Sequence, residues 1–386
     1  MDRLETTCAH LERLIAFPTI SSDSNLEMIS HLAEVLEGVG ARVEVQRDAS
    51  ATKANLLATI GPEENGGILL SGHSDVVPVA EQAWTSDPFT MVERDGKLYG
   101  RGSCDMKGFI ATCLASAPLF AERELARPVH FAFTHDEEVG CIGARHLAEL
   151  MQRRELRPAM AIIGEPTEMR IIEGHKGCYE YTTHFHGLAG HGSAPEMGVN
   201  AVEYAVRYVS HLLELKDRLR AMAPEDSRFE PPWTTVNVGA VNGGVAHNVI
   251  AENAAVDWDL RPVQRADADF VKSDLVAYCE DELLPAMQAV FPGASIETEV
   301  IGEVEGLIPA EENEARRIVA ELTGANSAGL VPFGTEAGIF QALGMDVVVC
   351  GPGSIEQAHK ADEFISRDQL GKCLDMLEKL AVRVTA

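Results

Sequence analysis

The stretch ILLSGHSD, from Ile68 to Asp75, joins a short apolar run to a cluster of polar side chains. Three later apolar runs have the same form, at residues 129–134, 159–164 and 347–351. Segments with helical periodicity lie between these runs, for example residues 108–120 and 143–153. Short apolar runs that alternate with helices are typical of a mainly parallel sheet covered by helices. The sequence therefore predicts an α/β fold, to which the amphipathic segments 4–17 and 368–384 add two further helices.

The middle of the chain has a different pattern, and we expect it to form a second domain. A chain of 386 residues exceeds the size at which one hydrophobic core usually keeps growing. Between residues 178 and 303 the expected elements follow the order β-α-β-β-α-β, which is that of a ferredoxin-like unit. We therefore expect an α/β domain from residues 1–177 and 304–386, with residues 178–303 inserted as an α+β domain.

Composition excludes several classes of function. The formal net charge of −28 would repel nucleic acid and anionic membranes, so we expect neither as a partner. The first residues lack a basic region followed by an apolar stretch, and no apolar run approaches the roughly 20 residues of a membrane span. The eight cysteines are sparse and form no Cys-x-x-Cys pair, which favours reduced thiols. These features predict a soluble cytoplasmic protein.

Polar residues follow the expected strands at their carboxyl ends, where open α/β sheets place their ligands. The candidates for metal binding are His73, Asp105, Glu138, Glu165 and His359. Imidazole and carboxylate groups suit zinc, cobalt or manganese, and a bridging carboxylate lets two ions lie roughly 3.5–4 Å apart. Asp105, in a turn-rich segment before a helix, is the candidate for the bridge.

Two further acidic residues have expected roles beside the metals. Asp75 shares a face with His73 in an extended segment, so it can hold the second imidazole N–H. Adjacent Glu137 and Glu138 cannot readily point the same way, so we expect Glu138 to bind metal and Glu137 to act as general base.

Each of these signals is weak when taken alone. A single His-x-Asp is more often a surface or hydrogen-bonded pair, and doubled glutamates are common on solvated helix faces. Glu165 could simply begin a helix whose first position is Pro166. The prediction depends on five candidates falling at the strand ends of one sheet.

Two motifs resemble the leading motifs of the M20 family of dinuclear zinc peptidases and deacylases: SGHSDVVP at residues 71–78 and YGRGSCDMKG at 99–108. The resemblance covers essentially the whole chain. It implies that His73 and Glu165 hold one ion, that Glu138 and His359 hold the other, and that Asp105 bridges them. It also implies two zinc ions, with cobalt as an alternative, and a smaller lid domain used for homodimerisation.

The resemblance implies further roles in binding the substrate. His191, in GHGSAP at residues 190–195, matches a lid histidine that polarises the scissile carbonyl in a neighbouring active site. Asn248 and Arg261 match positions that hold the substrate carboxylate, for which the planar fork of arginine is suited. Without the resemblance, His191 would be a loop histidine and Arg261 an ordinary residue at a strand end.

Within the family, PFGTEAG at residues 332–338 and VCGPGSIEQAH at 349–359 are similar to the branch that hydrolyses N2-acetyl-L-ornithine. Glu165, rather than Asp, is also typical of the deacylase and carboxypeptidase branches. The implied reaction releases L-ornithine and acetate, as in arginine biosynthesis, from a small acylated amino acid. We hypothesise that Glu336 pairs with the side-chain ammonium of this substrate, although it could instead cap the helix that follows.

Two alternatives stay open at this point. Another M20 reaction, such as succinyl-diaminopimelate desuccinylation or broad aminoacylase action, would use the same residues. A non-catalytic binding protein on the same fold is a different class, but binding alone needs no positioned base such as Glu137.

Overall fold

The computed structural model describes residues 2–385 and divides them into two compact units. The first unit comprises the described residues up to Gly174, Pro309–Leu330, and those from Thr335 onward. The second comprises His175–Ile308 and Val331–Gly334, slightly wider than the expected insertion of residues 178–303. Within residues 2–385, no helix combines the length and apolarity that crossing a membrane requires.

The first unit is built on an eight-stranded sheet with the order β1-β2-β6-β3-β7-β16-β8-β15. Its strands are β1 (Arg42–Arg47), β2 (Ala54–Ile60), β3 (Ile68–His73), β6 (Val129–Thr134), β7 (Met160–Pro166), β8 (Ile171–His175), β15 (Ala328–Val331) and β16 (Asp346–Gly351). The central strands β6, β3, β7 and β16 are parallel, whereas β1, β2 and β8 pair antiparallel with their neighbours. The predicted α/β fold class is confirmed, and the central strands are buried on both faces, as their uninterrupted apolar runs require.

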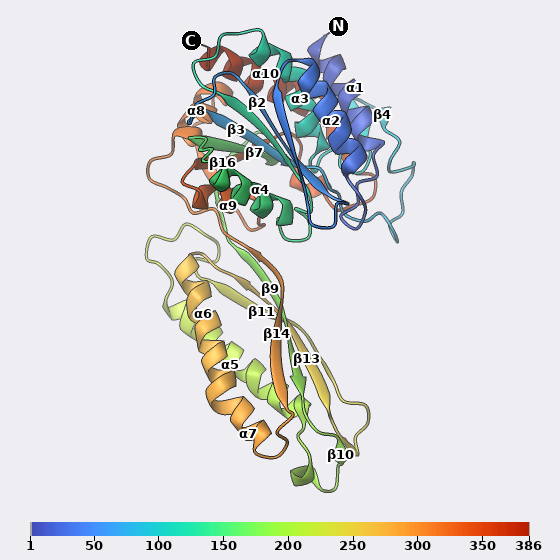
Figure 1. Ribbon diagram of the computed structural model, residues 1–386, viewed down its shortest axis with the longest axis vertical. Helices are drawn as coiled ribbons and strands as arrows, with labels where there is room; N and C mark the ends of the chain where they lie inside the picture. Colours follow the sequence, from blue (N-terminus) through green and yellow to red (C-terminus); the bar gives the residue numbers. More distant parts are fainter. Residues whose placement is uncertain (1, 386) are drawn as a thin grey trace. The chain divides into compact units, whose positions relative to one another are not determined.

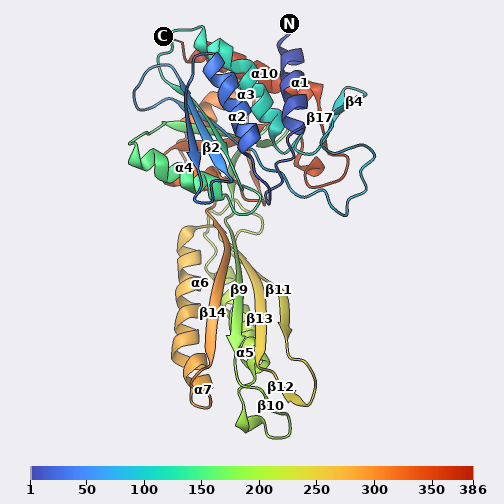
Figure 2. The same ribbon diagram turned by 45° about the vertical axis from the view of Figure 1, so that its right-hand side comes forward.

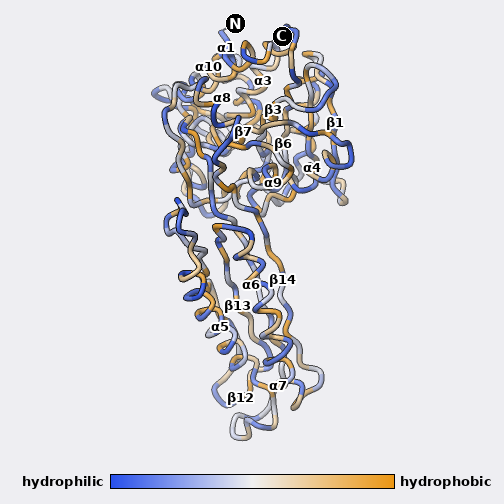
Figure 3. Tube along the Cα trace, turned by 90° about the vertical axis from the view of Figure 1, so that its left-hand side faces the viewer, coloured by the Kyte–Doolittle hydropathy of each residue, from blue (hydrophilic) through white to orange (hydrophobic). Residues whose placement is uncertain are grey.

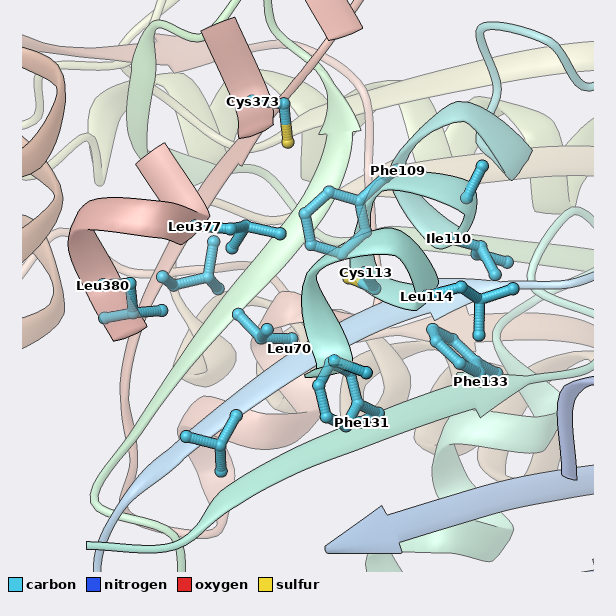
Figure 4. Close-up of a cluster of buried hydrophobic side chains, with 14 of the residues drawn as sticks. Leu70, Phe109, Ile110, Cys113, Leu114, Phe131, Phe133, Cys373, Leu377 and Leu380 are labelled. Atoms are coloured by element: carbon cyan, nitrogen blue, oxygen red, sulfur yellow. The ribbon is translucent and has the colours of Figure 1, made fainter. Parts of the chain in front are cut away.

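Helices cover both faces of this sheet (Figures 1 and 2). They are α1 (Arg3–Ile15), α2 (Leu26–Gly38), α3 (Lys107–Ala121), α8 (Glu314–Thr323) and α10 (Arg367–Arg383) on one face, and α4 (Ile142–Arg153) and α9 (Ala337–Ala342) on the other. Figure 4 shows how side chains of α3, α10 and the strands meet in one apolar cluster. Almost every residue of α3 is buried, which explains why this helix is apolar all round.

A small sheet with the order β17-β5-β4 lies at the edge of this unit. Its strands are β4 (Val92–Arg94), β5 (Lys97–Tyr99) and β17 (Phe364–Ser366). The pairing of β5 with β17 brings the segment before Asp105 next to the segment after His359, although they are far apart in sequence.

The second unit has a four-stranded antiparallel sheet with the order β11-β13-β9-β14. Its main elements are β9 (Cys178–His186), α5 (Ala201–Ala221), β11 (Thr235–Gly243), β13 (Asn253–Arg261), α6 (Arg265–Tyr278) and β14 (Ser295–Val304), with a short β10 (Gly190–His191) paired to β12 (Val249–Ile250). Alternate residues of β9 and β13 are buried, and their apolar side chains share a core with the two long helices. Figure 3 shows polar and apolar residues alternating along α5, as expected for a helix with one buried face.

The structure differs from the sequence prediction at the second long helix of this unit. The β-α-β-β-α-β order predicts a single helix here, but α6 ends at Tyr278. A wider π-helical turn then spans Cys279–Leu283, and α7 (Leu284–Gln288) follows. Pro285 has no backbone N–H to donate to the preceding turn, which accounts for the irregular hydrogen bonding there.

Candidate metal centre

The carboxyl ends of three neighbouring parallel strands carry the core of the site. His73 ends β3, Glu165 lies near the end of β7, and Glu137 and Glu138 follow β6. Because β6, β3 and β7 are adjacent in the sheet, these side chains meet at one edge. Gly164 is required for close packing here, because a Cβ at this position would lie 2.0 Å from the ring of Phe109 in α3.

Asp105 lies between two histidine–glutamate pairs. Its Oδ1 is 3.0 Å from Nε2 of His73, which is itself 3.7 Å from Oε1 of Glu165. Its Oδ2 is 3.4 Å from Nε2 of His359, which is 3.0 Å from Oε2 of Glu138. Each carboxylate oxygen of Asp105 therefore faces one set of nitrogen and oxygen donors, so the structure brings together all five predicted ligands.

The tautomer of His73 leaves the correct nitrogen available. Its Nδ1 lies 3.0 Å from the backbone carbonyl oxygen of Asp75, which can only accept a hydrogen bond, so Nδ1 carries the proton. Nε2 faces Oδ1 of Asp105. Burial lowers the pKa of His73, but hydrogen bonds to Asp105 and Asp75 raise it well above its usual value. A bound cation would take the place of the Nε2 proton. The imidazole is fully enclosed, with a side chain only 1% exposed.

The charges within this cluster favour a bound cation. Burial and the nearby Asp105 raise the pKa of Glu138, and the same two causes raise the pKa of Glu165 well above its usual value. Hydrogen bonds to Asp105 and Glu138 raise the pKa of His359 to about 10. Two buried oxygens, Oε1 of Glu138 and Oε1 of Glu165, have no hydrogen-bond partner. Crowded carboxylates with unsatisfied oxygens beside imidazole nitrogens fit divalent ions that take N and O ligands.

Glu137 lies beside these five residues, and its carboxyl is buried among negative charges. Burial raises its pKa to about 8, and the negative charges of Glu138, Asp75 and Asp105 act in the same direction, whereas His73 lowers it. Ligand atoms of Glu137, His73 and Glu165 lie within 4.8 Å of one another. The thiol of Cys141 donates to Oε1 of Glu137 at 3.4 Å.

Asp75 contacts more of the site than the sequence indicated. Its carboxylate is 3.5 Å from Nδ1 of His73, farther than its own carbonyl oxygen, so the main acceptor for the ring is the backbone. The carboxylate instead accepts the backbone N–H groups of Glu137 at 3.0 Å and Glu138 at 3.3 Å, and the hydroxyl of Ser21 at 2.7 Å. Asp75 thus links the histidine strand to the loop that carries both glutamates.

Glu336 is buried beneath this cluster rather than open to solvent. Its side chain accepts hydrogen bonds from Ser71 at 2.5 Å and Thr134 at 2.8 Å, and the residue is 1% exposed. Burial raises the pKa of this carboxyl, while the two hydroxyls lower it. Glu336 occupies the N-cap position of α9, but its side chain makes no capping hydrogen bond there. Its effect on substrate choice stays a prediction.

The remaining predicted residues belong to the second unit. His191 is exposed on β10, where its Nδ1 lies 2.8 Å from the hydroxyl of Ser193. Asn248 is exposed just before β12, and Arg261 ends β13 with its Nε 3.4 Å from Asp259. Their roles with substrate stay predictions.

The sequence interpretation missed a buried ion pair that supports the site. Nη1 of Arg101 lies 2.8 Å from Oε2 of Glu363, and both side chains are 1% exposed. Arg101 belongs to the second quoted motif and Glu363 follows His359 by four residues, but no pattern in the sequence predicts that they meet.

The chain is similar to known proteins along most of its length. The family model described as "Peptidase family M20/M25/M40" matches residues 69–383. The chain is 38% identical over 371 residues to acetylornithine deacetylase of Proteus mirabilis, covering 94% of this chain and 92% of that protein. It is 37% identical over 359 residues to acetylornithine deacetylase of Shigella sonnei, covering 91% of each.

Solved structures share the fold at much lower identity. An M20 family metallo-carboxypeptidase from Sulfolobus solfataricus has a TM-score of 0.75 at 18% identity, covering 97% of this chain and 98% of that one. A dinuclear metal-binding M20 peptidase from Bacillus subtilis has a TM-score of 0.64 at 18% identity, covering 99% of this chain and 98% of that one. At these identities the likeness supports the fold alone.

Proposed function

The chain belongs to peptidase family M20/M25/M40, and from that premise we propose that it hydrolyses N2-acetyl-L-ornithine to L-ornithine and acetate with two divalent metal ions. The observation that carries the proposal is the position of Asp105, with one oxygen facing His73 and Glu165 and the other facing His359 and Glu138. The two relatives named above, at 37% and 38% identity over most of the chain, support the choice of substrate.

His73, Glu165, Glu138 and His359 would hold the two ions, zinc or cobalt, with Asp105 as the shared ligand. When bound, such ions polarise a carbonyl oxygen and lower the pKa of water between them. Asp75 keeps the loop of Glu137 and Glu138 in register with β3 through its backbone hydrogen bonds. This arrangement fixes the base relative to the ligands before substrate arrives.

Glu137 is the general base of the proposed reaction. Its carboxylate takes a proton from the attacking water, a tetrahedral species forms at the acetyl carbon, and Glu137 returns the proton to the leaving amine. His191 supplies a hydrogen bond to the developing oxyanion, from the lid of a second copy in a homodimer. Asn248 and Arg261 bind the α-carboxylate of the substrate.

The test is a comparison of substrates with the metal-depleted and metal-restored enzyme. We expect hydrolysis of N2-acetyl-L-ornithine to cease on chelation and to return with zinc or cobalt, at rates above those for N-succinyl-diaminopimelate and N-acetylmethionine. Glu137→Gln should lower kcat by about 10²–10⁴-fold, whereas Glu149→Gln, on the exposed side of α4, should leave it unchanged. Faster turnover of either competing substrate would overturn the assignment of substrate.

A further inference from the structure

Glu363 is a buried carboxylate that collects hydrogen bonds from the loop carrying Asp105. Its Oε1 accepts the backbone N–H groups of Cys104 at 2.8 Å and Asp105 at 3.0 Å. Its Oε2 accepts the backbone N–H of Gly102 at 2.9 Å and Nη1 of Arg101 at 2.8 Å. Because one carboxylate accepts from three amides of this loop, it restricts where the side chain of Asp105 can lie.

Arg101 extends the same network to the loop carrying His359. Its guanidinium donates to the carbonyl oxygen of Lys360 at 3.3 Å and to Oε1 of Gln82 at 2.5 Å. The amide of Gln82 then donates to the carbonyl oxygen of His359 at 3.0 Å. One hydrogen-bond network, formed by Arg101, Glu363 and Gln82, therefore joins the loop of Asp105 to the loop of His359.

The two histidine–glutamate pairs of the metal site depend on this hydrogen-bond network to different degrees. His73 and Glu165 lie on β3 and β7, which the sheet holds in place independently. His359 lies on a loop, its side chain is 55% exposed, and its φ of 61° is a left-handed conformation that residues other than glycine rarely adopt. Its position therefore needs outside support, which the contacts of Gln82 and Arg101 supply.

We infer that Glu363, Arg101 and Gln82 are positioning residues for the proposed metal site. Gln82 and Arg101 set the affinity of the ion held by His359 and Glu138, whereas Glu363 acts on both ions through the shared Asp105. The inference rests on the proposed two-metal site. None of the three has to touch substrate or metal, since they act through the backbones of residues 102–105 and 359–360.

The test is calorimetric titration of the metal-free protein with zinc, which does not depend on turnover. His359→Ala identifies the binding step that belongs to His359. Glu363→Gln keeps the shape of the side chain but sets an amide donor against backbone donors, so we expect this step to weaken by about tenfold or more. The step assigned to His73 and Glu165 should weaken as well, because Asp105 is shared by both ions.

The first unit provides a control, because Glu173 on β8 is a second buried glutamate that pairs with an arginine, the partly exposed Arg316 on α8. Glu173→Gln should leave both zinc-binding steps unchanged, even where it lowers thermal stability. If Glu363→Gln does not fold, Gln82→Ala decides the question, since it removes the contact with His359 and leaves the buried pair intact. It should weaken the same step and leave the other unchanged.

The outcomes separate the inference from the proposed function. Equal weakening of both steps in Gln82→Ala, or unchanged affinity in the variants that fold, would overturn the positioning role while two-metal binding stands. Wild-type protein that binds fewer than two ions would instead contradict the proposed site itself.

Discussion

Replacing Asp75 by asparagine tests whether one carboxylate holds the loop of the general base. The carboxylate accepts from the backbone N–H groups of Glu137 and Glu138 and from the hydroxyl of Ser21. Asparagine has the same shape but only one acceptor oxygen, so an amide donor must face at least one of these donors. The loop should then shift or lose its fixed position.

The size of the effect follows from the bonds that change. Hydrogen bonds to a charged group contribute about 1.5–3 kcal/mol each, so loss of one backbone bond and weakening of the others should lower the free energy of unfolding by roughly 2–4 kcal/mol. A misplaced neighbour of a metal site typically costs about 10–100-fold in activity, and kcat of Asp75→Asn should fall by that factor. Ser21→Ala removes one bond to the same carboxylate, at a cost of about 1.5–3 kcal/mol, and leaves both backbone bonds to the glutamate loop in place.

The assay combines urea unfolding with kcat measured at saturating metal and substrate. Burial opposes ionisation of Asp75, but interactions with His73 and Ser21 lower its pKa below the usual 3.8. The stability due to the carboxylate is therefore present above pH 3.8 and is lost as pH falls through the lower folded value. An unchanged kcat in Asp75→Asn, or a stability loss no larger than that of Ser21→Ala, would refute the reasoning.

Three further predictions concern selectivity, metal and pH. Glu336→Gln removes a buried acidic group near the site. In parallel assays it should lower the rate on N2-acetyl-L-ornithine more than the rate on N-acetylmethionine. An equal fall in both rates would show that Glu336 only supports the packing. Removal of metal should lower the melting temperature more at pH 8 than at pH 6. In the metal-free protein the pKa of Glu137 is raised to about 8 and that of His359 to about 10, so the folded state loses stability as pH rises. If calorimetry shows that the effect of metal removal does not grow with pH, this explanation is wrong. Lys107 donates to the carbonyl oxygen of Phe17 at 2.7 Å, and burial lowers its pKa to about 7. Between about pH 7 and 10 this amine is therefore protonated in the unfolded chain but not in the folded protein. Wild-type stability should therefore rise with pH relative to Lys107→Met by up to about 1.4 kcal/mol per pH unit in urea titrations, and parallel curves would show that Lys107 is not the cause.

The sequence predicted the parts of the fold in which periodicity and burial coincide. Strands β3, β6, β7 and β16 are apolar runs buried on both faces, so they are visible in the sequence without knowledge of their neighbours. Strand β1 was not predicted, because its residues RVEVQR lie at an exposed sheet edge and lack a long apolar run. The short strands β5 and β17 are defined by their pairing with each other, which local sequence does not encode.

Four candidate ligands could be predicted because each follows a strand of the main sheet, whose end position is set by topology, whereas Asp105 was a candidate from the turn-rich segment before α3. The supporting residues could not. Glu363 and Arg101 acquire their roles only when distant segments meet, and a buried ion pair has no sequence periodicity. The backbone contacts of Asp75 with Glu137 and Glu138 are equally non-local, so the sequence identified its neighbour His73 and missed the loop.

The central claim is that Asp105 bridges two metal ions, and anomalous diffraction from zinc-loaded crystals tests it most directly. We expect two peaks about 3.5–4 Å apart, one beside His73 and Glu165 and one beside His359 and Glu138, with an oxygen of Asp105 bound to each. A single peak at full zinc occupancy, or two peaks that do not share Asp105, would contradict it.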